Sequence, residues 1–499
     1  MARIALVNPP FLFWDEGFEN LKSDHSPPLG LYILAAEAKK AGHDVLMVDL
    51  AIRPRPYQQA LAEIVDFAPD VAGMAAVTVN VHHAARFARD VKERLPACVT
   101  LLGGPHGTAL PEETLRRFPV FDVVVIGEGE RTFLELLETV DKPGGWETVN
   151  GLALPRDGEV HLTPPRKRID DLDTIAHPAW EYMPRYPEGY TAPLFNFKRL
   201  PAATLVTSRG CPMRCKFCSR AVFGNRIRFN SAAYVLDMVD RLVKEYGVRH
   251  LIFYDDMFVA NRKRLQKICE GLIANYGGRL SFSCNGRVGW MNREILALLK
   301  RAGCWQIAYG LESGTQRILE ILDKRQTLEK VEREVRLTRE AGIRVKGLFM
   351  MALPGETAKT VWATARFAAR LHLDLFQITK FTPLPGSPLY TEAEAWGTFE
   401  NDWKRMNMLN ALFVPHGMTR REIETLFWQI NQFYYGRAEM AFKLARFFLT
   451  HPHQIPLALK MGTEFFTRTL KHRWAAAKKA GPSGPEAASD REASDSPER

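Results

Sequence analysis

The sequence predicts an α/β protein: a doubly wound, Rossmann-like domain, then a partial (βα)₆ barrel, then a helical C-terminal region. The main observation is that short, nearly continuous apolar strands alternate with helix-length segments twice, over residues 1–140 and 201–390. A Pro- and Gly-rich segment, residues 141–200, connects the two alternations. The composition, 46% hydrophobic and 25% charged, is that of a globular protein and excludes general disorder, collagen and coiled coil.

The first alternation contains five strand-like runs. They are Arg3–Asn8, Asp44–Asp49, Asp70–Ala76, Cys98–Gly103 and Asp122–Ile126. Helical patterns lie between and after them, at Leu29–Ala41, Tyr57–Phe67, Val81–Leu95 and Arg131–Val140. Apolar strands with intervening helices indicate a parallel sheet covered on both faces. Such a sheet binds its ligand beyond the carboxyl ends of the strands, so we expect a ligand site at that edge.

The connecting segment is predicted to be a linker or lid that contains a small hairpin, Gly151–Leu154 and Glu159–Leu162. The second alternation then has six strand candidates: Ala203–Ser208, Arg249–Tyr254, Arg279–Cys284, Trp305–Gly310, Arg344–Met350 and Leu375–Lys380. Five helical stretches separate them, at Ala232–Tyr246, Arg264–Asn275, Arg293–Ala302, Leu328–Ala341 and Ala358–Leu371. Six βα units are too many for a small flavodoxin-like sheet and fewer than the eight of a closed barrel, which favours an open partial barrel.

Residues 391–480 are aromatic-rich and are expected to form a helical cap over the substrate site. Residues 481–499 are rich in Pro, Ser, Glu and Asp, a composition that predicts disorder. No apolar run approaches the roughly 18 residues that span a bilayer, and the N-terminus runs directly into a strand without a signal-peptide pattern. We therefore expect a cytoplasmic location.

Three of the seven cysteines, Cys211, Cys215 and Cys218, are crowded into eight residues directly after the first strand of the second alternation. Three thiolates at C-x₃-C-x₂-C spacing can hold one [4Fe-4S] cluster and leave one iron open to another ligand. The alternative, a structural zinc site, needs a fourth protein ligand, and no nearby Cys or His pair supplies one. The other four cysteines lie in apolar contexts typical of buried small side chains.

These cysteines, with the aromatic Phe217 before the last of them, match the signature of the radical S-adenosylmethionine (SAM) enzymes, which the second alternation therefore resembles. The resemblance implies that SAM chelates the open iron and is cleaved reductively to methionine and a 5′-deoxyadenosyl radical. It also implies a SAM-contacting role for Phe217.

Two further segments resemble SAM-binding strand ends of that family. Tyr254, Asp255 and Asp256 follow the second strand of the barrel, where relatives hold the amino group of SAM. Glu312 and Ser313 follow the fourth strand, where they would contact the ribose or the carboxylate of SAM. A paired Asp or a Gly-rich turn is weak evidence alone; the order of these segments behind the cysteine loop strengthens it.

The pairing of a doubly wound domain with this barrel resembles the cobalamin-binding radical SAM enzymes. The matching pieces are strand-end residues of the first domain: Asn8 and Pro9; Gly103, Gly104 and His106; Gly127, Glu128 and Gly129. Glycines there would let the backbone approach a large flat ligand closely. The Asp-x-His-x-x-Gly motif that supplies a lower axial histidine to cobalamin is absent from the sequence. The alternative for this domain is a degenerate fold that binds no cofactor.

The resemblance leaves two reactions open. One is C-methylation, in which the radical abstracts hydrogen from an unactivated carbon that then receives a methyl group by way of cobalamin; this is our preferred hypothesis. The other is oxidative ring closure, as in the anaerobic magnesium-protoporphyrin monomethyl ester cyclases. Either reaction implies an external electron donor of flavodoxin or ferredoxin type. The residues do not identify a catalytic proton donor or acceptor.

The formal charge of +10 is concentrated near the C-terminus, where residues 436–480 carry nine Lys and Arg against two Glu. A basic amphipathic helix of this kind can lie on an anionic membrane, and a solvated helix packed on the barrel is the alternative. We hypothesise peripheral contact with the inner face of the membrane and a small hydrophobic substrate, a lipid or terpenoid or a tetrapyrrole. A tRNA-modifying enzyme is a lesser alternative, because no RNA-binding module follows the barrel.

Overall fold

The computed structural model describes residues 1–10, 26–50, 56–140, 144–183, 186–187, 189–190, 193–456 and 458–459. Residues 1–441 form one compact unit, and a second unit begins at Phe442. The predicted disordered segment, residues 481–499, lies outside the described residues.

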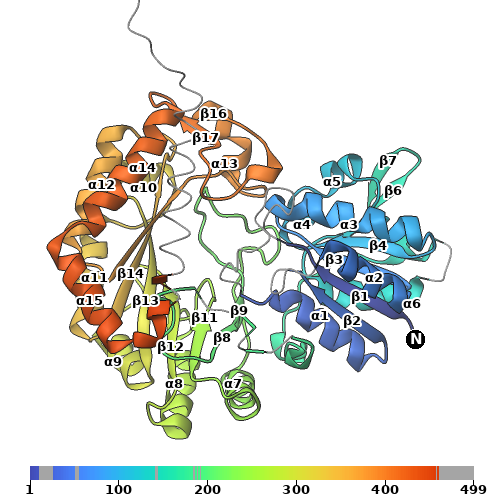
Figure 1. Cartoon of the computed structure of the whole chain (residues 1–499), viewed down its shortest axis with the longest axis horizontal. Helices are drawn as coiled ribbons and strands as arrows, with labels where there is room; N and C mark the ends of the chain where they lie inside the picture. The colour runs from blue at the N-terminus through green and yellow to red at the C-terminus, as the bar shows by residue number, and fades with distance from the viewer. Residues whose placement is uncertain are drawn as a thin grey trace, which may run out of the picture. The chain divides into compact units, whose positions relative to one another are not determined.

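The first sheet contains the five predicted parallel strands, each within two residues of its expected bounds (Figure 1). They are β1 (Arg3–Asn8), β2 (Asp44–Asp49), β3 (Val71–Ala75), β4 (Val99–Gly103) and β5 (Val123–Val125). Side chains alternate along β1: Ile4 and Leu6 join one hydrophobic core, and Ala5 and Val7 join another. This alternation is how a doubly wound sheet buries both of its faces.

Helices cover both faces of the first sheet. The core that contains Ile4 and Leu6 also holds α1 (Leu29–Lys40) and α6 (Gly129–Thr139), and the opposite core holds α2 (Tyr57–Phe67) and α3 (Val81–Arg94). Two short helices that the sequence pattern did not predict, α4 (Pro105–Ala109) and α5 (Pro111–Arg117), follow β4.

The hairpin of the connecting segment corrects the predicted strand count of this domain. Strands β6 (Leu152–Arg156) and β7 (Glu159–Leu162) extend the first sheet to seven strands, in the order β2-β1-β3-β4-β5-β6-β7. Strand β6 pairs antiparallel with β5, Val124 opposite Ala153, and the side chains of Leu152 and Ala153 are completely buried. The hairpin is therefore part of the sheet rather than of a linker, because its apolar face completes the core.

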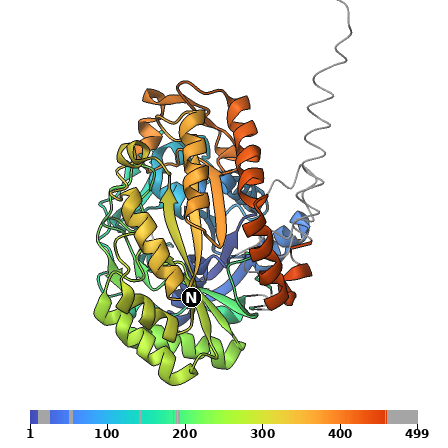
Figure 2. The ribbon, with the colours of Figure 1, turned by 90° about the vertical axis from the view of Figure 1, so that its left-hand side faces the viewer.

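The second sheet has six parallel strands in the order β8-β11-β12-β13-β14-β15, as a partial (βα)₆ barrel requires. Their bounds are β8 (Ala202–Leu205), β11 (His250–Phe253), β12 (Ser281–Gly286), β13 (Cys304–Glu312), β14 (Arg344–Met351) and β15 (Leu375–Lys380). The outer helices, seen from their own side in Figure 2, are α7 (Ala232–Tyr246), α8 (Arg262–Tyr276), α9 (Arg293–Arg301), α10 (Gln316–Ile321), α11 (Leu328–Glu340) and α12 (Ala358–Arg370).

Local chemistry explains where these helices begin. Five of them follow a Ser, Asn or Thr whose side-chain oxygen accepts a backbone N–H of the first turn. The cap residues are Ser231, Asn261, Asn292, Thr327 and Thr357.

The region after the barrel is not entirely helical, contrary to the prediction. A short antiparallel ribbon, β16 (Gly397–Phe399) with β17 (Phe413–Pro415), lies between α13 (Pro388–Thr391) and α14 (Arg420–Tyr435). Gly397 faces the backbone of Val414 so closely that a Cβ atom would clash with its oxygen. This close approach of two backbones favours the ribbon over a helix. Helix α15 (Ala438–Thr450) comes after α14, and a short 3₁₀ helix, Pro452–Gln454, follows α15.

Candidate active site at the cysteine loop

The three cysteines lie on one loop at the carboxyl end of β8. A two-residue antiparallel ribbon, β9 (Ser208–Arg209) with β10 (Arg228–Phe229), closes the base of this loop. Gly210 has φ +90°, and a Cβ atom there would lie 2.3 Å from the carbonyl oxygen of Arg226, so this position requires glycine. The geometry fixes where the backbone turns into the cysteine segment.

The cysteine loop borders a cavity of about 460 Å³. Cys211, Cys215 and Cys218 all line it. No group of three or more His, Cys, Asp or Glu side chains in the described residues converges to hold a single metal ion. A cubane cluster differs from such an ion, because each thiolate binds a different iron, so the ligands surround a volume rather than a point. Three cysteines around one cavity fit that requirement.

The cavity also brings in cations that sequence patterns did not identify. Arg287 donates to the Sγ atom of Cys215 at 3.8 Å and to the backbone oxygen of Lys324 at 2.5 Å. Lys324 in turn donates to Oε1 of Glu312 at 2.6 Å, and its Nζ lies 5.4 Å from the ring centroid of Phe217. Positive charge next to thiolates and a bound anion is electrostatically favourable.

The two aspartates after β11 have different surroundings. Asp256 lines the cavity, and burial raises the pKa of its carboxyl. Asp255 is completely buried and faces the base of the cysteine loop: its Oδ1 accepts from the N–H of Thr207 at 3.0 Å, the hydroxyl of Thr207 at 2.8 Å and the hydroxyl of Ser208 at 2.5 Å. Asp255 therefore anchors the loop, and Asp256 is the member of the pair positioned for a ligand.

The remaining residues predicted to contact SAM also differ from one another in their surroundings. Glu312 ends β13 with a left-handed backbone, φ +64°, and pairs with the cavity-lining Lys324. Ser313 is buried, and its hydroxyl lies 3.2 Å from that of Thr364. Tyr254 is half-buried, and its N–H donates to the oxygen of Leu205, which continues the pairing of β11 with β8.

Among the cobalamin candidates, the turn after β4 reaches the cavity. Gly104 has φ +94°, and a Cβ atom there would lie 2.9 Å from the backbone oxygen of Ala76. The next residue, Pro105, lines the same cavity as the three cysteines. This glycine turn therefore carries the backbone of the first domain to the cysteine cavity. Gly103 precedes the turn at the end of β4.

The turn after β5 is open above its glycine. Gly127 has φ +83°, and a Cβ atom there would meet nothing within 4 Å. Its N–H donates to the hydroxyl of Thr108. Gly129 opens α6, and a Cβ atom there would lie 3.7 Å from Leu34. A flat ligand lying over these turns would meet backbone rather than side chains, which is the fit that cobalamin requires.

Three polar cobalamin candidates are engaged within the protein. Asn8 donates to Asp49 at 2.8 Å, and Glu128 forms ion pairs with two arginines. His106 is 1% exposed, its Nδ1 lies 3.1 Å from the hydroxyl of Thr78, and burial lowers its pKa to about 3. Its ring packs edge-on against Trp403. Pro9 contributes its backbone oxygen, which accepts from Asn80 at 3.3 Å.

Residues 205–368 match the radical SAM superfamily, and residues 19–137 match the B12 binding domain. An uncharacterized methyltransferase of Pyrococcus horikoshii is 31% identical over 448 residues, which covers 89% of this chain and 94% of the relative. This chain belongs to the cobalamin-binding radical SAM enzymes.

Other members show the breadth of this family. The anaerobic magnesium-protoporphyrin IX monomethyl ester cyclase of Rubrivivax gelatinosus is 31% identical over 409 residues, 80% of this chain and 71% of the cyclase. The solved structure of OxsB, with aqua-cobalamin and SAM bound, matches 87% of this chain and 67% of its own with a TM-score of 0.71 at 20% identity. As a cobalamin-binding radical SAM enzyme, this protein uses a [4Fe-4S] cluster, SAM and cobalamin. Membership in this family establishes that the protein is an enzyme of the methyltransferase or cyclase type.

Proposed function

We propose that this protein transfers a methyl group to an unactivated carbon of a small hydrophobic substrate, of lipid, terpenoid or tetrapyrrole type. The observation that carries the proposal is that Pro105, from the strand-end turn of the first domain, and the three cysteines line one cavity. A methyl carrier on the first domain and a radical source on the cysteine loop would then act on the same cavity. The methyltransferase relative from Pyrococcus horikoshii supports methyl transfer as the reaction.

Each part of the site has a proposed role. Three irons of the cluster would be held by Cys211, Cys215 and Cys218. SAM would be bound by Phe217, Asp256 and the Glu312–Lys324 pair. These SAM-binding positions would be supported from behind by Asp255, Tyr254 and Ser313. The cluster supplies the electron that cleaves SAM, and cobalamin supplies a methyl carrier. The chain itself orients these groups. Backbone at Gly103, Gly104, Gly127 and Gly129 accommodates the corrin.

A second cavity supports, as part of the proposal, an acidic group on the substrate. It has a volume of about 640 Å³ and shares Arg220 and Gly224 with the cysteine cavity. The guanidinium of Arg220 makes no hydrogen bond or ion pair within the described part of the chain. An unpaired arginine beside an apolar cavity suits a carboxylate or phosphate on an otherwise hydrophobic molecule. Such a group occurs on tetrapyrroles and on isoprenoid phosphates.

The first test is the iron and cobalamin content of protein purified without oxygen from cobalamin-fed cells. We expect about four irons and one cobalamin per chain, and S-adenosylhomocysteine in turnover with SAM and a low-potential reductant. Iron without cobalamin would refute the proposal. The second candidate is oxidative ring closure, which the cyclase relative supports; turnover that yields 5′-deoxyadenosine and cyclised product without S-adenosylhomocysteine would favour it.

The electron donor and the membrane contact of this protein are also proposals. A flavodoxin or ferredoxin would deliver the electron. In the described residues, no helix is long and apolar enough to cross a membrane. Phe442 and Leu449 of α15 are 68% and 83% exposed, and these side chains motivate the hypothesis of peripheral membrane contact. Equal sedimentation of the full chain and of a chain ending at residue 435 with anionic liposomes would overturn it.

A further inference from the structure

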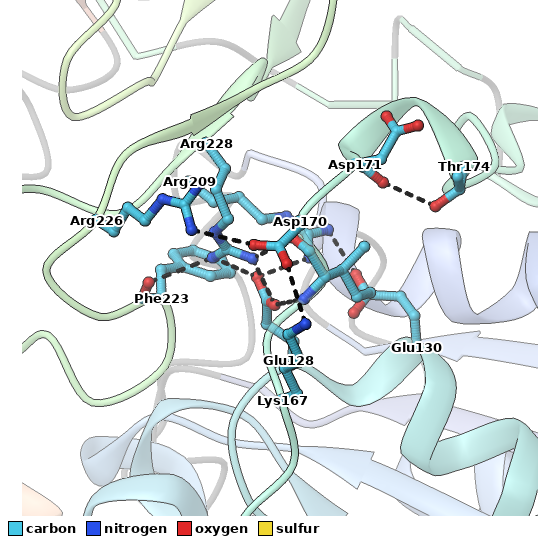
Figure 3. Close-up of polar contacts among 11 residues, drawn as sticks. Glu128, Glu130, Lys167, Asp170, Asp171, Thr174, Arg209, Phe223, Arg226 and Arg228 are labelled. Atoms are coloured by element: carbon cyan, nitrogen blue, oxygen red, sulfur yellow. Dashed lines mark hydrogen bonds and ion pairs between the residues drawn. The ribbon is translucent and has the colours of Figure 1, made fainter.

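Four charged side chains form a buried cluster between the first domain and the cysteine loop (Figure 3). Glu128 and Glu130 belong to the turn after β5 and the start of α6, and Arg209 and Arg228 face each other across the β9–β10 ribbon. Their side chains are between 3% and 10% exposed. We name these four residues the hinge cluster.

The ion pairs of the hinge cluster fix the relative orientation of its side chains. Arg228 binds Glu128 with both ends of its fork: Nη1 to Oε2 at 2.7 Å and Nη2 to Oε1 at 2.8 Å. Arg209 bridges the two glutamates, 3.3 Å from Oε1 of Glu128 and 2.5 Å from Oε1 of Glu130. Bidentate arginine–carboxylate pairs fix both distance and orientation, which a single ion pair does not.

Three further contacts tie this cluster to its surroundings. Glu128 also accepts the N–H of Ile169 at 3.0 Å, and Arg228 donates to the backbone oxygens of Ile169 at 2.6 Å and Phe223 at 3.3 Å. Phe223 lines the cysteine cavity. Arg209 is separated from Cys211 only by the obligatory glycine at position 210. A shift of Glu128 would therefore be transmitted to the cysteines through two residues.

We propose that the hinge cluster positions the cysteine loop against the strand-end turns of the first domain, and thereby controls whether the methyl group of cluster-bound SAM reaches the cobalamin. Its residues are positioning residues, since they act through the loop and not on the reacting atoms. The inference rests on the proposed function, because it assigns the first domain a cobalamin that takes part in methyl transfer.

Two fates of SAM distinguish this role from a purely structural one. Transfer of the sulfonium methyl to two-electron-reduced cobalt leaves S-adenosylhomocysteine, and it requires alignment between the two domains. One-electron reduction by the cluster breaks the bond between sulfur and C5′, giving methionine and a radical that ends as 5′-deoxyadenosine; this step requires the barrel alone. A low-potential reductant supplies the electrons for both. Neither assay needs the final substrate.

The experiment compares Glu128→Gln with Asp170→Asn in the cofactor-loaded full chain. Asp170 pairs with Arg226 at 3.4 Å in the same region, but both side chains are more than half exposed, so it is the matched control. We expect Glu128→Gln to lower the rate of S-adenosylhomocysteine formation at least about tenfold relative to that of 5′-deoxyadenosine, a 1.4 kcal/mol difference between the two barriers. Asp170→Asn should leave the ratio unchanged.

A second readout does not depend on turnover. Hydrogen exchange of backbone amides in residues 210–227 should become at least about tenfold faster in Glu128→Gln, because the loop loses its fixed attachment. If Glu128→Gln fails to fold, Arg209→Lys replaces it, since lysine keeps the charge but cannot bridge both glutamates.

The outcomes separate the two proposals. An unchanged ratio and unchanged exchange in either variant would overturn the positioning role. Equal losses of both SAM products would also overturn it, because that is the result of a structural defect. A wild-type protein that cleaves SAM but forms no S-adenosylhomocysteine and binds no cobalamin would refute the proposed function instead.

Discussion

Asp255 offers the sharpest test of how the cysteine loop is held. Its Oδ1 accepts three hydrogen bonds from Thr207 and Ser208, which directly precede the loop. Arg264 reinforces the same point by donating to the oxygen and the hydroxyl of Thr207 at 2.9 and 2.6 Å. Replacement of Asp255 by alanine would leave three buried donors without their acceptor, and replacement by asparagine would retain one acceptor oxygen.

The magnitude follows from these contacts. Hydrogen bonds to a charged group contribute about 1.5–3 kcal/mol each, and such values do not add within one network. Burial also raises the pKa of Asp255, against the effect of the Ser208 hydrogen bond and the Arg264 charge, which offsets part of the gain. We therefore expect about 3–5 kcal/mol of lost loop stability for Asp255→Ala, as for a broken buried network, and about 1–2 kcal/mol for Asp255→Asn.

Native-state hydrogen exchange measures this local stability without requiring the whole chain to unfold reversibly. In the peptide that contains Thr207, Asp255→Asn should lower protection about 5- to 30-fold and Asp255→Ala more than about 150-fold. Asp256→Asn is the matched control, because Asp256 lines the cavity and does not bond to the loop. Equal protection in Asp255→Ala and Asp256→Asn would refute the anchoring role.

Three further outcomes follow from the same geometry. Alanine at any one of the three loop cysteines should reduce the iron content of the anaerobically purified protein from about four per chain to below about one, whereas alanine at the buried Cys269 should leave it unchanged; iron retained in the loop variants would contradict the cluster assignment. Gly104→Ala should lower the apoprotein's melting temperature more than Gly127→Ala. Alanine is strained by about 1–2 kcal/mol at both left-handed positions, but only at Gly104 would the new Cβ atom meet backbone atoms. Equal shifts in melting temperature would contradict this close approach. Burial lowers the pKa of His106 to about 3, so the contribution of its neutral imidazole to the free energy of unfolding is complete above pH 6.5 and should fall by about 1.4 kcal/mol per pH unit as the pH drops toward 3. Urea titrations at pH 7.5 and 5.5 should show a smaller loss of unfolding free energy in His106→Gln than in the wild type. Identical losses would contradict a buried neutral imidazole.

Most strands and helices could be predicted because their signals are local. The apolar run Arg3–Asn8, for example, has the same bounds in the structure as in the prediction. Partner choice is not local: nothing within Leu152–Arg156 states that it pairs with β5 rather than forming a separate hairpin. The ribbon that contains Gly397 was missed for a similar reason, since its close partner, Val414, lies outside the local sequence pattern around Gly397.

The candidate site shows the same division. The spacing of the three cysteines is a local signal, and it predicted the loop that lines the cavity. Lys324 and Arg287 carry no local signal, because single cations between helices and strands are common. The Asp255–Asp256 pair shows a further limit: sequence identified both carboxylates, but only the backbone direction at the end of β11 determines which of them faces the cavity.

Glu128 illustrates that a polar residue at a strand end can either bind a ligand or form contacts within the protein. The prediction assigned it to cobalamin, because ligands bind at that edge of a doubly wound sheet. In the structure its carboxylate is fully engaged by Arg209 and Arg228. A buried ion pair is a weak source of stability, since well-packed apolar side chains of similar volume are often as stable. What four buried charges supply that apolar packing does not is a fixed direction and distance, and here that geometry lies between the ligand edge of one sheet and the cysteine loop of the other.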